Sequence, residues 1–106
     1  MTDLKVEFED SRIERLCTDE AWARRKRGDV ADKIKLRVNA VVNALTLADL
    51  VTNDPLGSWH VLGAQFPRCW SGKLSANYRL LLRPSTEDSE PENIDAVTIT
   101  QVIDYH

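Results

Sequence analysis

Hydrophobic and polar residues alternate near both ends of the chain, which predicts a β-strand at each end. Near the N-terminus, Leu4, Val6 and Phe8 alternate with charged residues. This period of two is typical of a strand with one buried face. Near the C-terminus, the segment AVTITQVIDY follows the same pattern. We therefore expect a first strand at residues 4–8 and a last strand at residues 96–105.

Two short helices are expected directly after the first strand. Asp10 or Ser11 has a side chain suited to capping the first helix, and Thr18 or Asp19 is suited to capping the second. The second helix is expected to end at Gly28, because glycine commonly follows the last turn of a helix.

A third, longer helix is expected to begin near Asp29. Apolar residues recur there with the helical period of 3.6, at Val30, Ile34, Val38, Val41, Val42 and Leu45. Lys33, Lys35 and Arg37 fall between these positions, so we expect them to face away from the core. A further capped turn of helix and then a loop are expected in the segment 46–57.

The second half of the chain changes to short β-like runs, at residues 58–63, 68–74 and 78–83. The acidic, proline-containing segment 84–93 is expected to be a solvated loop. Residues 1–106 are enough for one domain with a small core. The order β-α-α-β-β-β-β predicts an α+β fold, in which N-terminal helices pack on one side of a twisted, mainly antiparallel sheet.

The net charge of −3 hides a very uneven distribution of charged residues. Both ends are acidic, whereas residues 21–83 carry eleven basic and only four acidic side chains. A local basic surface attracts phosphate whatever the net charge, because salt screens distant charges. The densest cluster is Arg24, Arg25, Lys26 and Arg27, which we expect to bind RNA. The alternative is that these cations only complement the dipole at a helix end.

Several functional classes find no support in the sequence. Cys17 and Cys69 lack metal-ligand spacing, so we expect free thiols, with a single disulfide as the alternative. The chain has no zinc-binding pattern and no glycine-rich phosphate loop, so we expect neither a metal nor a cofactor. It also has no export signal and no apolar run that could span a membrane. We therefore expect a soluble, cytoplasmic protein.

The chain has two histidines, His60 and His106, and both fall in the β-rich half. They are accompanied by an acid, a phenol and three cations: Asp104, Tyr105, Arg68, Lys73 and Arg79. RNA cleavage by its own 2′-hydroxyl needs a base, an acid and cations near the phosphate. Imidazole suits either proton transfer, and arginine matches phosphate oxygens. These residues are therefore the inventory of a metal-free ribonuclease, although a histidine on a strand is more often a surface or core residue.

The segment SWHVLGAQFPRCWSGKLSANYRLLLRP, followed by the terminal VIDYH, resembles the HigB-type killer toxins of the RelE/ParE superfamily. Those toxins carry a pattern close to W-x-x-H-x-L-K-G-D, then a Y-W-S-like strand, then N-[WY]-R-[IL], and they end in D-Y-H. The upstream half is similar to the helical half of the same toxins. The resemblance therefore extends over nearly the whole chain.

This resemblance implies the toxin of a type II toxin–antitoxin system, a metal-independent endoribonuclease that cuts mRNA on the ribosome. It implies a fold like that of microbial ribonucleases, and a cognate antitoxin protein, expected to carry a helix-turn-helix domain. The residues that match the family's active site are His60, Asp104, Tyr105 and His106. Arg79 falls where a phosphate-binding residue is expected.

One departure from the family pattern bears on activity. Where the pattern has L-K-G-D, this chain has the segment 62–65, LGAQ, so the lysine expected at the phosphate is Gly63. Arg68 or Lys73 is expected to supply the missing charge; otherwise cleavage should be slow. Two alternatives stay open: a ParE-like toxin that binds DNA gyrase without cutting RNA, and an inactive toxin that serves as antitoxin ligand and co-repressor.

Overall fold

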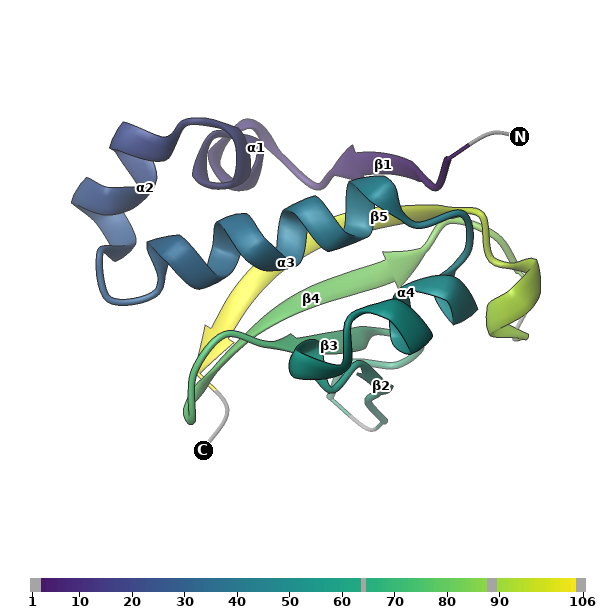
Figure 1. The fold of residues 1–106 in the computed structure, drawn as a ribbon. Helices are drawn as coiled ribbons and strands as arrows, with labels where there is room; N and C mark the ends of the chain where they lie inside the picture. Colours follow the sequence, from purple (N-terminus) through teal and green to yellow (C-terminus); the bar gives the residue numbers. More distant parts are fainter. Residues whose placement is uncertain (1–2, 64, 88–89, 105–106) are drawn as a thin grey trace.

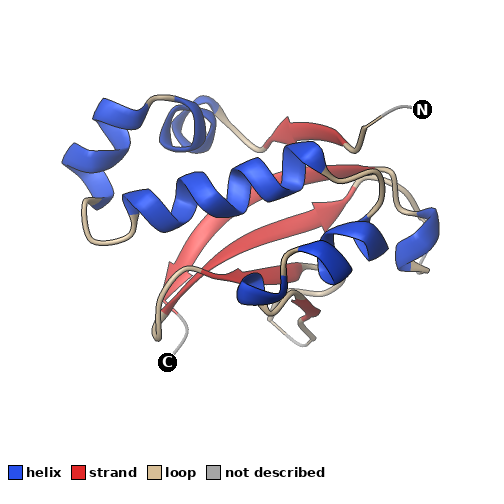
Figure 2. Cartoon of the chain, in the orientation of Figure 1, coloured by secondary structure: helices blue, strands red, loops and turns tan. Residues whose placement is uncertain are grey.

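The fold is known from a computed structural model, which describes residues 3–63, 65–87 and 90–104. Helices lie over one face of a five-stranded sheet (Figures 1 and 2). In chain order the elements are β1 (Lys5–Phe8), α1 (Ser11–Thr18), α2 (Glu20–Arg27), α3 (Ala31–Asn43), α4 (Leu47–Asn53), the 3-10 turn η1 (Pro55–Gly57), β2 (His60–Val61), β3 (Trp70–Lys73), β4 (Tyr78–Pro84), the 3-10 turn η2 (Pro91–Asn93) and β5 (Ala96–Asp104).

The sheet has the strand order β1-β5-β4-β3-β2. The chain folds back through antiparallel neighbours from β2 to β5, and β1 then pairs with β5 in the parallel direction. This arrangement confirms the expected α+β class, with helices on a mainly antiparallel sheet. The parallel pair was not predicted, because strand alternation alone does not indicate which strands become neighbours.

The helix starts confirm two of the predicted caps. Asp10 accepts a hydrogen bond from the Ile13 N–H at 2.9 Å, and Asp19 accepts one from the Trp22 N–H at 3.0 Å. Such side-chain acceptors satisfy backbone N–H groups that have no partner inside the helix. Four α-helices lie within the described part of the chain, which agrees with the four helical segments expected one by one, although the condensed order β-α-α-β-β-β-β names only two.

The expectations for α3 need three corrections. Arg37 is buried, with 3% of its surface exposed, whereas Val42 is 39% exposed. The buried stripe of α3 is Ile34, Arg37, Val38 and Val41, which follows the pattern i, i+3, i+4, i+7. Arg37 therefore sits on the buried side and needs a partner for its charge. Leu45 lies beyond the end of the helix.

The sheet has two faces that differ in what covers them. Directly opposed residues on neighbouring strands share a face. Leu80 and Leu82 lie on the covered face and belong to the core with α3 and α4. Residues that alternate with these leucines point to the opposite face, which we call the open face. It carries Ser71, Lys73 and Arg79. Within the described residues, no helix covers it (Figure 1).

Two further expectations can be compared with the structure. Both cysteines are free thiols, as the sequence predicted. Cys17 is half-buried against the core, and this burial raises the pKa of its thiol to about 12. In the described ranges, no helix is both long enough and apolar enough to cross a membrane.

Candidate functional site

The open face brings together three of the predicted site residues. His60 lies on β2 directly opposite Ser71 on β3, and Lys73 follows two residues after Ser71 on the same face. Such diagonal neighbours lie roughly 7–8 Å apart. Lys73 in turn lies directly opposite Arg79 on β4. An imidazole and two cations therefore occupy adjoining positions on the open face.

Arg79 is held at this surface by the turn that joins β3 to β4. Its Nη1 donates to the Ser75 carbonyl at 2.6 Å and to the Tyr78 carbonyl at 3.1 Å. The turn is itself fixed, because Ser75 Oγ accepts from the Asn77 N–H at 3.3 Å and from the Tyr78 N–H at 3.2 Å. A guanidinium anchored in this way binds an anion with little loss of side-chain freedom.

His60 is exposed, and its Nδ1 lies 2.8 Å from the Ser58 carbonyl oxygen. A carbonyl only accepts hydrogen bonds, so Nδ1 is the donor and carries a proton. Ser71, which faces His60, is 1% exposed, and its hydroxyl has no hydrogen-bond partner in the described structure. Sequence reasoning missed Ser71 because a lone serine on a strand carries no distinguishing signal.

Asp104 occupies a different place from these residues. It ends β5 and lies opposite Tyr78. Tyr78 packs against the core, and the Arg27 guanidinium stacks over its ring at 4.5 Å. The register therefore puts Asp104 on the covered side, three strand spacings or roughly 14 Å across the sheet from β2. Tyr105 and His106, the other two predicted C-terminal site residues, lie outside the described residues.

The structure distinguishes the two candidates for the missing lysine. Arg68 lies at the opposite end of β3 from Lys73 and donates to the Thr86 carbonyl. It has a left-handed backbone conformation with φ of 67°. Lys73, by contrast, neighbours both His60 and Arg79 on the open face. Among the described residues, no atom lies within 4 Å of a Cβ built on Gly63, and its φ is not positive.

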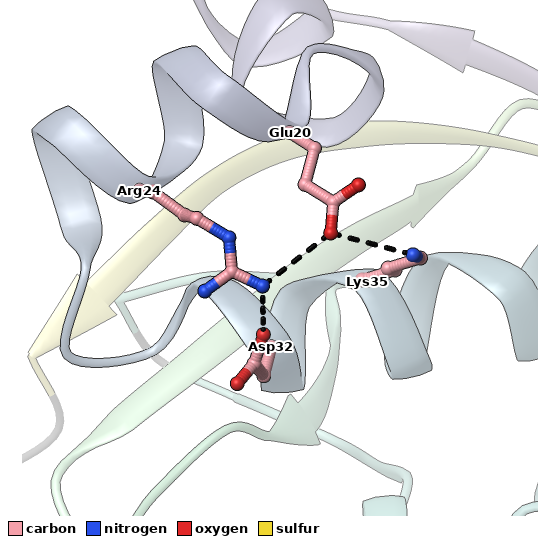
Figure 3. Close-up of polar contacts among 4 residues, drawn as sticks. All are labelled: Glu20, Arg24, Asp32 and Lys35. Atoms are coloured by element: carbon pink, nitrogen blue, oxygen red, sulfur yellow. Dashed lines mark hydrogen bonds and ion pairs between the residues drawn. The ribbon is translucent and has the colours of Figure 1, made fainter.

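The basic cluster at the end of α2 is partly neutralised within the chain (Figure 3). Arg24 Nη2 lies 2.7 Å from Asp32 and 3.4 Å from Glu20, and Lys35 pairs with the same Glu20 oxygen at 3.4 Å. These ion pairs tie α2 to α3. They favour a structural role for Arg24, whereas Arg25 is exposed and makes no ion pair within the described ranges.

The other two cations of the cluster line a cavity. Lys26 lies 5.8 Å from the Trp22 ring centroid, and Arg27 is 3.8 Å from Asp29 besides stacking on Tyr78. Both line a cavity of about 430 Å³ between the α1–α2 pair and β5. A second cavity, of about 560 Å³, lies on the open side between Phe66 and β4–β5. Sequence periodicity indicates neither cavity.

No group of three potential metal ligands occurs among the residues that the structure describes. The open face offers proton transfer at His60 and binding of negative charge at Lys73 and Arg79. Cleavage of a phosphodiester needs both proton transfer and binding of negative charge.

No family model matches the sequence, and no curated protein matches it. Among solved structures, the chain is similar to a YoeB/ParE toxin from Agrobacterium tumefaciens, with 19% sequence identity and a TM-score of 0.50. The match covers 96% of this chain and 99% of that one. The chain therefore shares the fold of that toxin, with N-terminal helices packed on a mainly antiparallel sheet, as its sequence resemblance to the RelE/ParE superfamily led us to expect.

Proposed function

We propose that this protein is the toxin of a type II toxin–antitoxin system, of the HigB kind, and that it cuts mRNA on the ribosome without a metal ion. One observation carries the proposal: His60, Lys73 and Arg79 adjoin on the open face. The fold shared with a YoeB/ParE toxin and the sequence resemblance support it further.

The cleavage chemistry follows from the properties of these groups. Arg79 and Lys73 bind the phosphate and offset the negative charge that grows when the 2′-hydroxyl attacks it. His60 accepts the proton of that hydroxyl. The resemblance assigns Asp104, Tyr105 and His106 to the same reaction, in which one of them protonates the leaving 5′-oxygen.

Asp104 lies on the other side of Arg79 from His60 in the strand order. Asp104 is one strand away from Arg79, because its neighbour Ile103 lies directly opposite Arg79. The roles of Tyr105 and His106 in this reaction rest on the sequence resemblance, while His60 and Lys73 act from β2 and β3.

Lys73 is our choice for the cation that replaces the family lysine missing at Gly63. It adjoins His60 and Arg79, whereas Arg68 lies at the far end of β3. A cation held near the developing charge commonly contributes a few kcal/mol to transition-state stabilisation. We therefore propose that the enzyme is active, with a cleavage rate below that of a toxin that has the lysine in the family position.

The proposed partners follow from the same resemblance. They are the ribosome with its mRNA and a cognate antitoxin with a helix-turn-helix domain, and all three meet the toxin in the cytoplasm. We assign ribosome docking to the exposed part of the basic cluster, chiefly Arg25 and Lys26, because Arg24 and Arg27 are engaged within the chain.

Induced expression in bacteria, with mapping of new mRNA 5′ ends, tests the proposal. The parent should arrest growth and create new 5′ ends inside coding regions. His60→Gln, which keeps a side chain of similar size without the imidazole, should abolish the new ends while the protein stays folded. Growth arrest without any new 5′ ends would contradict RNA cleavage and favour the gyrase-binding alternative.

A further inference from the structure

A buried polar network lies directly behind His60. Arg37 Nη1 is 2.7 Å from Asp54 Oδ1, and the two side chains are only 4% and 14% exposed. The other carboxylate oxygen, Oδ2, accepts a hydrogen bond from Trp59 Nε1 at 2.9 Å. The network therefore connects α3, the end of α4 and the residue that precedes His60.

This network holds the indole of Trp59 in one place. A Cβ atom on Gly72 would lie 2.4 Å from Trp59 Cη2, and a Cβ atom on Gly57 would lie 2.4 Å from Trp59 Nε1. The ring thus occupies space that only glycine leaves free at both positions. Desolvating an ion pair is costly, so a buried pair is weak support for stability alone.

The residue between this network and His60 has an unfavourable backbone conformation. Ser58 has φ of 45° and ψ of 46°, in the left-handed region that side chains with a Cβ rarely adopt. Its N–H donates to the Pro55 carbonyl at 3.1 Å, which fixes it on the 3-10 turn η1. Such conformations persist only where their surroundings enforce them, and they are enriched at functional sites.

The left-handed turn directs the Ser58 carbonyl to the ring of His60, 2.8 Å from Nδ1. We infer that Arg37, Asp54 and Trp59 are positioning residues that fix this carbonyl, hold His60 as its Nδ1–H tautomer, and so leave Nε2 as the proton acceptor. The free imidazole group, in contrast, exchanges between two neutral tautomers. The network acts on His60 only through Ser58 and the backbone.

The catalytic value of this device rests on the proposed function. In that reaction the 2′-hydroxyl proton passes to Nε2, and the 2′-oxygen forms a bond to phosphorus. The bond from phosphorus to the 5′-oxygen breaks, and that oxygen takes a proton from one of the three C-terminal residues that the resemblance assigns to the reaction. The resulting imidazolium keeps its Nδ1–H bond to the Ser58 carbonyl, which is stronger for a charged donor.

Nuclear magnetic resonance of the purified, ¹⁵N-labelled chain tests the inference without any activity assay. Correlations from the carbon-bound ring protons show which ring nitrogen carries hydrogen, at a pH of about 9 where imidazoles are neutral. The chain has two histidines, so the variant His106→Gln assigns the His60 signals. The parent should show Nδ1 protonated and Nε2 unprotonated. A dominant Nε2–H form in the parent would overturn the inference.

The variant Trp59→Phe keeps most of the ring but removes the N–H that binds Asp54. It should shift the tautomer ratio of His60 towards Nε2–H by about fivefold, the effect of losing one net hydrogen bond. The matched control is Trp22→Phe, the same change on α2, where the ratio should stay at the parent value. If Trp59→Phe does not fold, Asp54→Asn gives the same readout. An unchanged ratio in the folded variant would overturn the network's role.

Ribosome-dependent cleavage by the same variants separates this inference from the proposed function. If both hold, Trp59→Phe lowers kcat for mRNA cleavage about fivefold and leaves the KM for programmed ribosomes unchanged. A parent that fails to cut mRNA but shows the Nδ1–H tautomer and its loss in Trp59→Phe would contradict the function and uphold the positioning network. A parent that cuts mRNA but has the Nε2–H tautomer would uphold the function and contradict the positioning network.

Discussion

His60, Lys73 and Arg79 are neighbours because the registers of β2 with β3 and of β3 with β4 bring them together. His60, Lys73 and Arg79 could be chosen from the sequence because imidazole and cations suit phosphate chemistry. That Lys73 rather than Arg68 joins them depends on which residues of β3 lie opposite β2 and β4. Arg37 was wrongly predicted to face away from the core. Charged residues are seldom buried unless they are paired, and the sequence pattern does not indicate that Asp54, a residue distant in sequence, pairs with Arg37.

The two serines near the site should respond differently to alanine. Ser71 has a buried hydroxyl with no partner in the described structure, whereas Ser75 accepts two backbone hydrogen bonds. We expect Ser71→Ala to leave the free energy of unfolding unchanged or to raise it, and Ser75→Ala to lower it by about 1 kcal/mol. Urea denaturation measures both. A loss at Ser71 as large as that at Ser75 would mean that its hydroxyl has a partner.

Cys17 should be unreactive in the folded protein. Burial raises the pKa of its thiol to about 12, so the reactive thiolate is scarce at neutral or mildly alkaline pH. The pKa of Cys69 is also raised by burial. We expect neither thiol to react with a chromogenic disulfide reagent at a pH of about 8 before unfolding, and both to react in denaturant. Rapid labelling of the native protein would contradict the burial of these side chains.

At the scale of elements, the strands and helices were predictable where local pattern decides them. The strand at residues 4–8 and the helices capped by Asp10 and Asp19 lie where the sequence indicates. β2 is shorter than the run 58–63 suggested, with two residues only. Ser58 has a left-handed conformation and Trp59 is held by Asp54, so the strand starts at His60. Contacts distant in sequence set that boundary.

The fit between β2 and β3 should depend on Gly72. An alanine there would place its Cβ 2.4 Å from the Trp59 ring, so the indole and β2 must move. We expect Gly72→Ala to lower the free energy of unfolding by about 1–3 kcal/mol, as overpacking does. Gly63→Ala is the control, because no atom of the described residues lies within 4 Å of a Cβ there. Equal stability of the two variants would contradict the packing of Trp59.

At the scale of the whole molecule, the uneven charge is arranged by the fold rather than by the sequence order. The run at residues 24–27 reads as one basic cluster, yet Arg24 is bound to Asp32 and Glu20 (Figure 3). Composition predicts that a basic region exists but does not indicate which cations are neutralised by neighbours. The fold class was predictable from the order of elements, whereas the strand neighbours and the open face were not.

The cations of α2 should therefore contribute unequally to ribosome binding. We expect Arg25→Ala to weaken co-sedimentation with ribosomes and to reduce the slope of log affinity against log salt by about 1. Arg24→Ala should change that slope less, because Arg24 is already paired within the chain. Equal slopes for the parent and both variants would contradict ribosome binding by these cations and favour the alternative that they only complement the helix dipole.

If the open face cuts RNA, its cations should set the rate of mRNA cleavage on purified, programmed ribosomes. Lys73 adjoins His60 and Arg79, whereas Lys33 is an exposed lysine on α3, in the helical layer. Lys73→Ala should slow cleavage by about a hundredfold, the usual effect of losing one group that stabilises the transition state, while Lys33→Ala should cut at the parent rate. Equal rates for both variants, or a parent that does not cut mRNA, would contradict RNA cleavage at the open face.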